Sequence, residues 1–262
     1  MTPFLFLHLT DPHLPPPNGL LFGLDPAPRL ASAIADIAAR HAAGSAAPAV
    51  FVVLTGDLSR DGEPDAYARL RAMLAGLPCP AHLLLGNHDD RAAFRAAFPT
   101  APVDPHGFVQ QALATPAGLC LMLDTHEPGR PEGHLCPLRL GWLAERLAEG
   151  DGDVLLFLHH PPMPVGIPGM DAIGLVQAEA LWQVLRPHRT RIRQMFHGHL
   201  HRPIAGSWRG IPLSSLRGTA FQVPLGFTPG GIVPDGREPP CYAVVRVSAD
   251  AVVVHTHEVV DG

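Results

Sequence analysis

Short hydrophobic runs and longer amphipathic segments alternate along most of the chain. The short runs are rich in leucine, valine, isoleucine and phenylalanine, which is typical of buried strands. They predict strands over residues 4–9, 50–54, 82–85, 154–158 and 192–196, and a hairpin over 108–113 and 119–123. The longer segments carry apolar residues three or four positions apart, which is typical of helices that bury one face. They predict helices over residues 28–41, 65–75, 91–98, 138–147 and 177–185.

This alternation of strands and helices predicts an α/β fold. Short strands and turns follow from residue 204, and a second hairpin is predicted over 242–247 and 252–259. No internal repeat or linker divides the chain, and 47% of its residues are hydrophobic, which is enough for a buried core. We therefore interpret residues 1–262 as one domain, with 204–262 as its strand-rich C-terminal part.

The charge balance argues against nucleic acid as the main partner. The sequence has 24 acidic and 19 basic residues, a formal net charge of -5, and no basic run or stripe. All the basic residues are arginine, so a lysine nucleophile or Schiff base is excluded. A small molecule is the expected partner, and the oligomeric state stays open, a homo-oligomer included.

Location and redox state are also predicted from composition. The N-terminal segment lacks the basic region of a signal peptide, and no apolar run approaches the roughly 18 residues that span a bilayer. The four cysteines are widely spaced, which favours reduced thiols over a disulfide framework. We predict a cytoplasmic protein without a membrane partner.

Polar loops with metal-competent side chains follow five of the predicted strands. In open α/β sheets, ligand sites form where such loops converge beyond the carboxyl ends of strands. Each loop alone could be a simple turn, but their joint occurrence in this order argues against coincidence. The loops are Asp11-x-His13, Gly56-Asp57, Gly86-Asn87-His88-Asp89, His159-His160 and Gly198-His199-x-His201.

These five segments resemble the signature of the calcineurin-like metallophosphoesterase superfamily, and the match extends from Thr10 to His201. The wider segments 10–14, 55–58, 85–91 and 159–162 resemble one branch of it, the class III cyclic nucleotide phosphodiesterases and related bacterial glycerophosphodiesterases. The resemblance implies a four-layer α/β/β/α sandwich of two mixed β-sheets flanked by helices. It also implies a binuclear metal centre at one end of the sheets.

The resemblance assigns a role to each motif residue by its position. Asp57 is expected to bridge two metal ions. The other implied ligands are Asp11, His13 and His201 for one ion, and Asn87, His159 and His199 for the other. Mixed nitrogen and oxygen ligands suit Mn or Fe, with Zn as an alternative, better than Ca, which prefers oxygen alone. Two such ions about 3.5–4 Å apart can activate a bridging hydroxide for in-line attack on phosphorus.

Two further residues are candidates for catalysis. The resemblance places His88 beside the substrate, where it would stabilise charge on the phosphate and protonate the departing alkoxide. Asp89 either orients His88 through a hydrogen bond or caps the helix over 91–98. The choice of His159 over His160 as a ligand rests on the family pattern alone, and His197 has no assigned role.

Three functions remain in view. The first is a phosphodiesterase for small diesters such as cyclic nucleotides or glycerophosphodiesters. The second is another enzyme of the same fold: a phosphomonoesterase, a nucleotide pyrophosphatase or a nuclease. The third is a non-catalytic binding scaffold, which the loss of ligands would mark. The substrate depends on the loops 14–24, 161–175 and 216–240, whose conformation the sequence does not determine.

Overall fold

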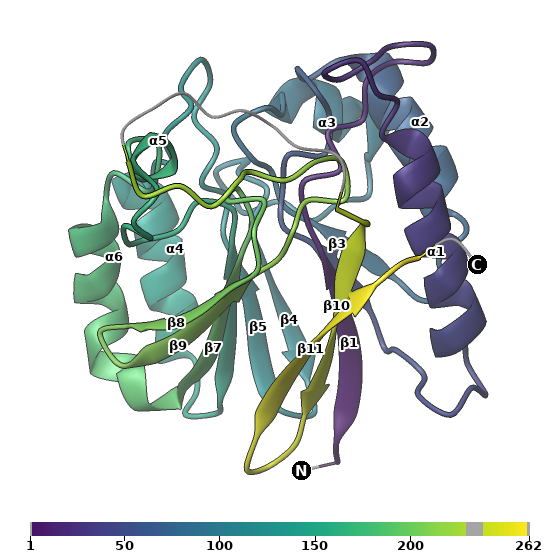
Figure 1. Cartoon of the computed structure of the whole chain (residues 1–262). Coiled ribbons are helices and arrows are strands. Elements are labelled where there is room, and N and C mark those ends of the chain that lie inside the picture. The colour runs from purple at the N-terminus through teal and green to yellow at the C-terminus, as the bar shows by residue number, and fades with distance from the viewer. Residues whose placement is uncertain (1, 229–237, 261–262) are drawn as a thin grey trace.

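Two mixed β-sheets pack face to face and helices cover their outer faces (Figure 1). The computed structural model describes residues 2–228 and 238–260. Of the loop 216–240, residues 229–237 therefore lie outside the described residues. In the part of the chain that is described, no helix is long and apolar enough to cross a membrane.

The first sheet has the strand order β11-β10-β1-β2-β3. Its parallel strands are β1 (Phe4–Leu9), β2 (Val52–Leu54) and β3 (Ala81–Leu83). The hairpin of β10 (Cys241–Val247) and β11 (Val252–Glu258) joins β1 in antiparallel register. The C-terminal hairpin thus extends the sheet that begins at the N-terminus.

The second sheet has the strand order β4-β5-β6-β7-β9-β8. Its central strands β5, β6, β7 and β9 are parallel, and the edge strands β4 and β8 are antiparallel to their neighbours. The bounds are β4 (Gln111–Thr115), β5 (Gly118–Met122), β6 (Val154–Leu158), β7 (Ile192–His197), β8 (Ile204–Trp208) and β9 (Ile211–Ser215).

The side chains of β1 alternate between two hydrophobic cores, which shows how the layers of the fold are arranged. Leu7 and Leu9 pack under the helices, whereas Phe4 and Phe6 point between the sheets, because successive side chains of a strand face opposite ways. The first sheet is covered by α1 (Ala27–His41), α2 (Pro64–Leu74) and α3 (Arg91–Ala97). The second is covered by α4 (Pro137–Ala148) and α6 (Ala178–Leu185). The predicted α/β/β/α sandwich is confirmed.

Local departures from the predicted elements have identifiable causes. The first strand of the 108–123 hairpin begins at Gln111, because the amide of Val109 donates to the Asp124 carboxylate instead of joining the ladder. The short helix α5 (Pro168–Asp171) and the 3₁₀ helix η1 (Arg186–Arg191) were not predicted, since neither is long enough to show a hydrophobic period.

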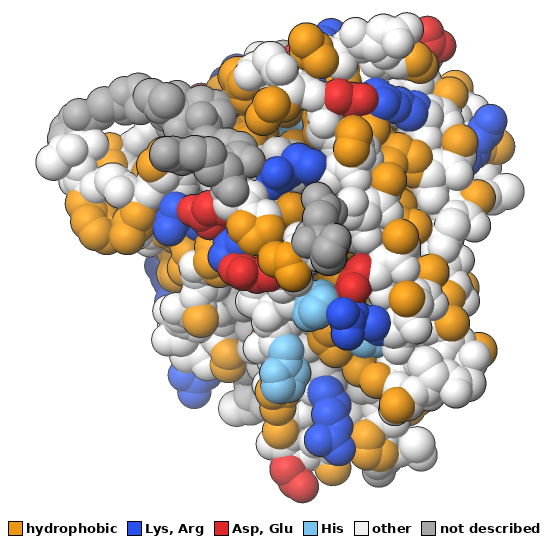
Figure 2. Space-filling view, turned by 45° about the vertical axis from the view of Figure 1, so that its right-hand side comes forward, with side chains coloured by type: hydrophobic (Ala, Val, Ile, Leu, Met, Phe, Trp, Pro, Cys, Tyr) orange, Lys and Arg blue, Asp and Glu red, His pale blue; other side chains and the backbone are white. Residues whose placement is uncertain are grey.

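The charged side chains on one face of the molecule are dispersed. Figure 2 shows a face on which the described arginine side chains alternate with acidic, hydrophobic and uncharged polar ones. Several arginines are held in ion pairs, as in Arg60 with Glu63, Arg146 with Glu149 and Arg209 with Glu179. This dispersal agrees with the absence of a basic stripe in the sequence.

Candidate metal centre

The five polar loops follow the carboxyl ends of β1, β2, β3, β6 and β7, at the upper end of both sheets in Figure 1. They bring all the proposed ligands into one cluster. Contacts of 3.0–3.4 Å between side-chain atoms link them in a continuous chain. The members of this chain are Asp11, His201, His13, Asp57, His159, Asn87 and His199.

One half of the cluster is built on Asp11, His13, Asp57 and His201, whose ligand atoms lie within 4.8 Å of one another. The Nε2 atom of His13 is 3.0 Å from Nε2 of His201 and 3.3 Å from Oδ2 of Asp57. Ligands of one ion, with bonds of about 2.0–2.2 Å at roughly 90–110°, are separated by about 2.9–3.5 Å. The spacing of these atoms therefore fits a shared cation.

The other half is built on His159, His199 and Asn87. The Nε2 atom of His159 is 3.3 Å from Nδ1 of His199 and 3.3 Å from Oδ1 of Asn87. It is also 3.4 Å from Oδ2 of Asp57, the same oxygen that contacts His13. Asp57 thus lies between two groups of ligand atoms, where one carboxylate can serve two cations.

The surroundings of His159 and His160 differ. Nδ1 of His159 donates to the backbone oxygen of Thr55 at 2.7 Å, so Nε2 is the nitrogen left to bind a metal. His160 also lies close enough to His199 to share a cation, but its Nδ1 contacts the Thr125 hydroxyl at 2.8 Å. Its Nε2 contacts the oxygen of Pro131 at 3.2 Å. Because both nitrogens of His160 already have partners, His159 is the better donor to a metal.

The loops hold their ligands in a backbone conformation that most residues avoid. Among the described residues, eight other than glycine have a positive φ. Five of these eight are proposed ligands: Asp11, His13, Asp57, His199 and His201, with φ between 41° and 69°. The left-handed region is unfavourable for side chains with a Cβ, and such strain concentrates at functional sites. Surrounding contacts must therefore enforce this geometry.

Glycines let these loops approach one another closely. A Cβ at Gly86 would lie 2.2 Å from Oδ1 of Asp57, and one at Gly198 would lie 2.2 Å from Oγ1 of Thr10. Neither position can accept a larger residue without displacing a proposed ligand or its support. The glycines of the G-N-H-D and G-H-x-H segments thus have a steric role in the cluster.

A chain of buried hydrogen bonds holds the Asp11 carboxylate in place. The hydroxyl of Thr10 donates to Oδ2 of Asp11 at 2.6 Å, and the hydroxyl of Thr55 donates to Thr10 at 2.8 Å. Thr55 in turn contacts Nε2 of His8 at 2.8 Å. A carboxylate only accepts hydrogen bonds, and each hydroxyl has one proton to donate. Thr10 therefore donates to Asp11, Thr55 donates to Thr10, and Nε2 of His8 must donate to Thr55. The sequence analysis did not assign this supporting role to His8, Thr10 or Thr55.

Replacing Thr10 by valine should weaken metal binding while the protein still folds. Valine keeps the shape of the side chain but removes the donor to Asp11, and loss of such a supporting bond costs about 10–100-fold in metal affinity. Titration of the metal-free variant against a chromophoric chelator measures this affinity. The matched control is Thr256→Val at an exposed position of β11. Unchanged metal affinity in Thr10→Val would show that the chain does not support the site.

The electrostatics of the cluster suit a cation. Burial opposes the charge of Asp57, but the nearby His159 and His13 outweigh it, and the pKa of the carboxyl lies well below its usual value. Burial lowers the pKa of both His13 and His199 to about 3, so these rings are neutral donors at neutral pH. Burial acts in the same direction on His159, but Asp57 outweighs it and raises the pKa to about 9. A cation that binds there must displace this proton.

His88 lies at the mouth of the cluster rather than inside it. Its side chain is 42% exposed, its ring centre is 4.7 Å from that of His13, and its Nδ1 donates to the backbone oxygen of Arg60 at 2.8 Å. Its amide donates to Oδ1 of Asp57. The Nδ1 bond leaves Nε2 free, as a residue that contacts a substrate requires.

Asp89 has neither of the two contacts expected of it. The cap of α3 is Asp90, which accepts from the amide of Ala93 at 2.7 Å, and the ring of His88 is held by Arg60. Asp89 instead ties the β2 and β3 loops together. Its buried carboxylate accepts bonds from the amides of Leu58, Ser59 and Gly86 and from the hydroxyls of Ser59 and Tyr67. Burial, aided by the charge of Asp57, raises the pKa of Asp89 to about 6.

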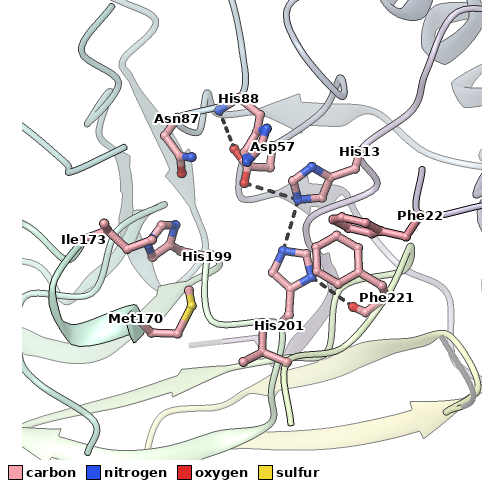
Figure 3. Close-up of a pocket in the computed structure, with 11 residues that line it drawn as sticks. His13, Phe22, Asp57, Asn87, His88, Met170, Ile173, His199, His201 and Phe221 are labelled. Atoms are coloured by element: carbon pink, nitrogen blue, oxygen red, sulfur yellow. Dashed lines mark hydrogen bonds and ion pairs between the residues drawn. The ribbon is translucent and has the colours of Figure 1, made fainter. Parts of the chain in front are cut away.

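A cavity of about 220 Å³ opens onto the cluster (Figure 3). Its polar side consists of His88 and five of the proposed ligands, all except Asp11 and His159, and its other side is apolar. Phe221 stacks on the ring of His201 at 4.0 Å and accepts a bond from its Nδ1 through the backbone oxygen. Phe22 packs edge-on against Phe221 at 5.1 Å. Both phenylalanines lie in loops without a recognisable sequence pattern, so neither was predicted as a site residue.

The arginines near the motif loops have partners of their own. Arg91 pairs with the buried Asp124 at 2.8 Å, and Arg202 donates to the backbone oxygen of Val223. Arg60 pairs with Asp61 and Glu63. These contacts give all three arginines structural roles in the loops around the site.

Comparison with known proteins identifies the family. Residues 4–203 match the family model of calcineurin-like phosphoesterases. The chain belongs to this family. A member from Rhodopseudomonas palustris, named a probable cyclic nucleotide phosphodiesterase, is 45% identical over 255 residues, which cover 95% of this chain and 90% of that protein. A cAMP/cGMP dual specificity phosphodiesterase of Mycobacterium tuberculosis is 34% identical over 240 residues. The aligned region covers 87% of this chain and 71% of that protein.

A solved structure shares the fold of this calcineurin-like phosphoesterase. A dimetal phosphatase from Danio rerio matches with a TM-score of 0.72 at 18% identity, over 98% of this chain and 97% of that one. At this identity the likeness concerns the fold alone. It agrees with the four layers of the fold.

Proposed function

We propose that this calcineurin-like phosphoesterase hydrolyses small phosphodiesters, cyclic nucleotides among them, at a centre of two divalent cations. The observation that carries the proposal is the position of Asp57, whose Oδ2 contacts both His13 and His159. A buried carboxylate between two groups of imidazole and oxygen ligands is the arrangement that two neighbouring cations need. The two relatives described above are named as phosphodiesterases of cyclic nucleotides, which supports this substrate class.

The proposed ligands divide into two sets that share Asp57. Asp11, His13 and His201 would hold one cation, and Asn87, His159 and His199 the other. Mixed nitrogen and oxygen donors favour Mn or Fe, with Zn as an alternative. When bound, the two cations lower the pKa of water and neutralise charge on the phosphate oxygens. Nδ1 of His159 and Nδ1 of His201 each donate a hydrogen bond to a backbone carbonyl oxygen. These bonds orient each ring so that its Nε2 can bind a cation.

His88 is the proposed general acid. The backbone oxygen of Arg60 holds its Nδ1, so a proton on Nε2 can pass to the departing alkoxide. Asp57 holds the backbone of His88 through Oδ1, which couples the position of the acid to the metal cluster. Asp89 positions the same loop through its bonds to β2 and does not contact the substrate in this proposal.

Other functions have less support. A non-catalytic scaffold would have lost ligands, whereas every motif position of this chain is filled. A nuclease that holds a duplex needs a continuous basic surface, whereas the sequence has no basic run or stripe and the arginines on the face in Figure 2 are dispersed. A phosphomonoesterase and a nucleotide pyrophosphatase of the same fold are the remaining alternatives, and each is distinguished by its substrate.

Exhaustive chelation should abolish turnover and leave the fold intact, because the hydrophobic cores do not depend on the cations. The assay uses cyclic AMP, bis(p-nitrophenyl) phosphate and p-nitrophenyl phosphate, with Mn, Fe or Zn restored separately to the metal-free protein. Circular dichroism monitors the fold. Turnover that survives chelation would contradict the two-metal proposal. Faster cleavage of the monoester than of both diesters would identify a phosphomonoesterase.

A further inference from the structure

A tight turn with an unusual residue borders the cavity at the proposed metal centre. The backbones of Leu21 and Leu24 exchange two hydrogen bonds, of 2.7 and 2.9 Å, across a two-residue hairpin loop. The loop residues Phe22 and Gly23 both have a positive φ, of 49° and 81°. This is the backbone of a type I′ turn, whose first position strongly prefers asparagine, aspartate or glycine. Phe22 therefore occupies a position that a bulky side chain normally avoids.

The ring of Phe22 is not buried in a hydrophobic core, so core packing does not account for this strain. Phe22 is 64% exposed and lines the cavity that opens onto the proposed ligands. The segment before the turn is tied to the site, because Arg60 donates to the backbone oxygen of Leu20 and accepts from the ring of His88. Backbone strain of this kind concentrates at functional sites. The strained turn thus holds an exposed aromatic ring at the cavity.

Phe22 and Phe221 form an aromatic corner in the wall of this cavity. Their rings are nearly perpendicular, at 86°, with centres 5.1 Å apart. One face of Phe221 is covered by the ring of His201, whose centre is 4.0 Å away. Figure 3 shows both phenylalanine rings beside His13 and His201, away from Asn87. The open aromatic surface therefore belongs mainly to Phe22, and a planar group can stack on it.

The size of the cavity brings this surface within reach of a nucleotide. The volume is about 220 Å³, below the roughly 300–1,000 Å³ of typical small-molecule pockets. A nucleotide whose phosphate meets the proposed metal ligands must therefore extend to the rim. Phe221 contacts both His201 and the more exposed Phe22, so the aromatic wall runs from the ligands to the rim. The planar base of the nucleotide is the part that would lie against this wall.

We propose that Phe22 is a specificity-determining residue that stacks on the base of a bound nucleotide, and that the strained turn serves to hold its ring there. The inference rests on the proposed function and names the residue that recognises the base. Stacking needs only a planar ring and tolerates different bases. Phe22 therefore favours nucleotides over phosphates that lack a base, without selecting one base by hydrogen bonds.

The test compares two phosphates that differ in the presence of a base: adenosine 5′-monophosphate and ribose 5-phosphate. Each is titrated as a competitive inhibitor of bis(p-nitrophenyl) phosphate hydrolysis by the metal-loaded protein. The inhibition constant should be about tenfold lower for the nucleotide, as expected for one stacked base. In the Phe22→Asn variant the ratio of the two constants should fall toward one. The Phe22→Tyr variant keeps an aromatic ring and should keep the ratio.

A second measurement separates this role from a structural one. Asparagine suits the type I′ turn better than phenylalanine does, so Phe22→Asn should melt at the same temperature as the unaltered protein or above it. Thermal unfolding followed by circular dichroism measures this temperature. A ring that stabilised the fold would lower the melting temperature when it is removed. A lower melting temperature in Phe22→Asn would therefore contradict the proposed purpose of the strained turn.

The matched control is Phe227→Asn, which removes a phenylalanine that is 68% exposed and does not line the cavity. It should keep the tenfold ratio. A ratio near one in the unaltered protein would overturn the role of Phe22, as would a ratio that survives in Phe22→Asn or a nucleotide that does not inhibit. Those results would leave diester hydrolysis itself intact. If no diester is hydrolysed with any metal, the proposed function fails, and the role of Phe22 fails with it.

Discussion

Replacing Asp57 by alanine is expected to abolish both metal occupancy and turnover. Its Oδ2 is the atom that joins the two halves of the cluster, and its charge offsets the repulsion between two cations. Without this carboxylate, the repulsion between two closely spaced cations is no longer offset, and the remaining ligands hold each cation less tightly. Metal content by atomic spectroscopy should fall well below two ions per chain, and hydrolysis of bis(p-nitrophenyl) phosphate should fall to background.

Two further variants separate charge from structure in this experiment. Asp57→Asn keeps an oxygen that can accept from the amide of His88, so its loop should stay in place while the bridging charge is lost. Asp250→Asn, in the exposed turn between β10 and β11, makes the same chemical change away from the site and should have no effect. Full activity in Asp57→Asn would contradict the bridging role.

Replacing His88 by alanine should slow the reaction without removing the metals, because His88 belongs to neither half of the cluster. The loss should depend on the leaving group. An alkoxide needs a proton to depart, and a positioned general acid contributes about 10²–10⁴-fold, whereas nitrophenolate departs with little help. The rate on cyclic AMP should therefore fall much further than the rate on bis(p-nitrophenyl) phosphate.

The control for this variant is His106→Ala, which changes an exposed histidine outside the site. Equal losses on both substrates would assign His88 to electrostatic stabilisation of the phosphate instead of proton transfer. No loss on either substrate would remove His88 from the mechanism. Loss of metal together with activity would make it part of the metal site.

Much of the fold could be predicted because its signals are local. The helix predicted over 28–41 is α1 (Ala27–His41), since periodic apolar residues and an early proline both act within a few positions of one another. The β6 strand (Val154–Leu158) was predicted at both ends, because a short run of large apolar residues ends abruptly at two histidines. Such signals do not depend on the rest of the chain.

The errors occurred where a distant residue sets the local structure. The strand predicted from residue 108 starts later because Asp124 takes the amide of Val109. Asp89 was expected to act on its neighbours, but its carboxylate is held by the β2 loop and by Tyr67. A carboxylate forms bonds with whichever donors the fold brings to it, and the sequence does not contain their positions.

The sequence by itself determined the types and order of the side chains at the site, because each motif lies in one short loop after one strand. Only the tertiary structure decided which of these side chains can bind a metal and which only support the site. His159 and His160 are identical neighbours in the sequence, yet Nε2 of His159 lies beside Asp57 and the other proposed ligands, whereas both nitrogens of His160 contact Thr125 and Pro131. The apolar wall with Phe22 and Phe221 likewise comes from loops far apart in the chain. Its chemistry depends on which surfaces meet when the two sheets pack.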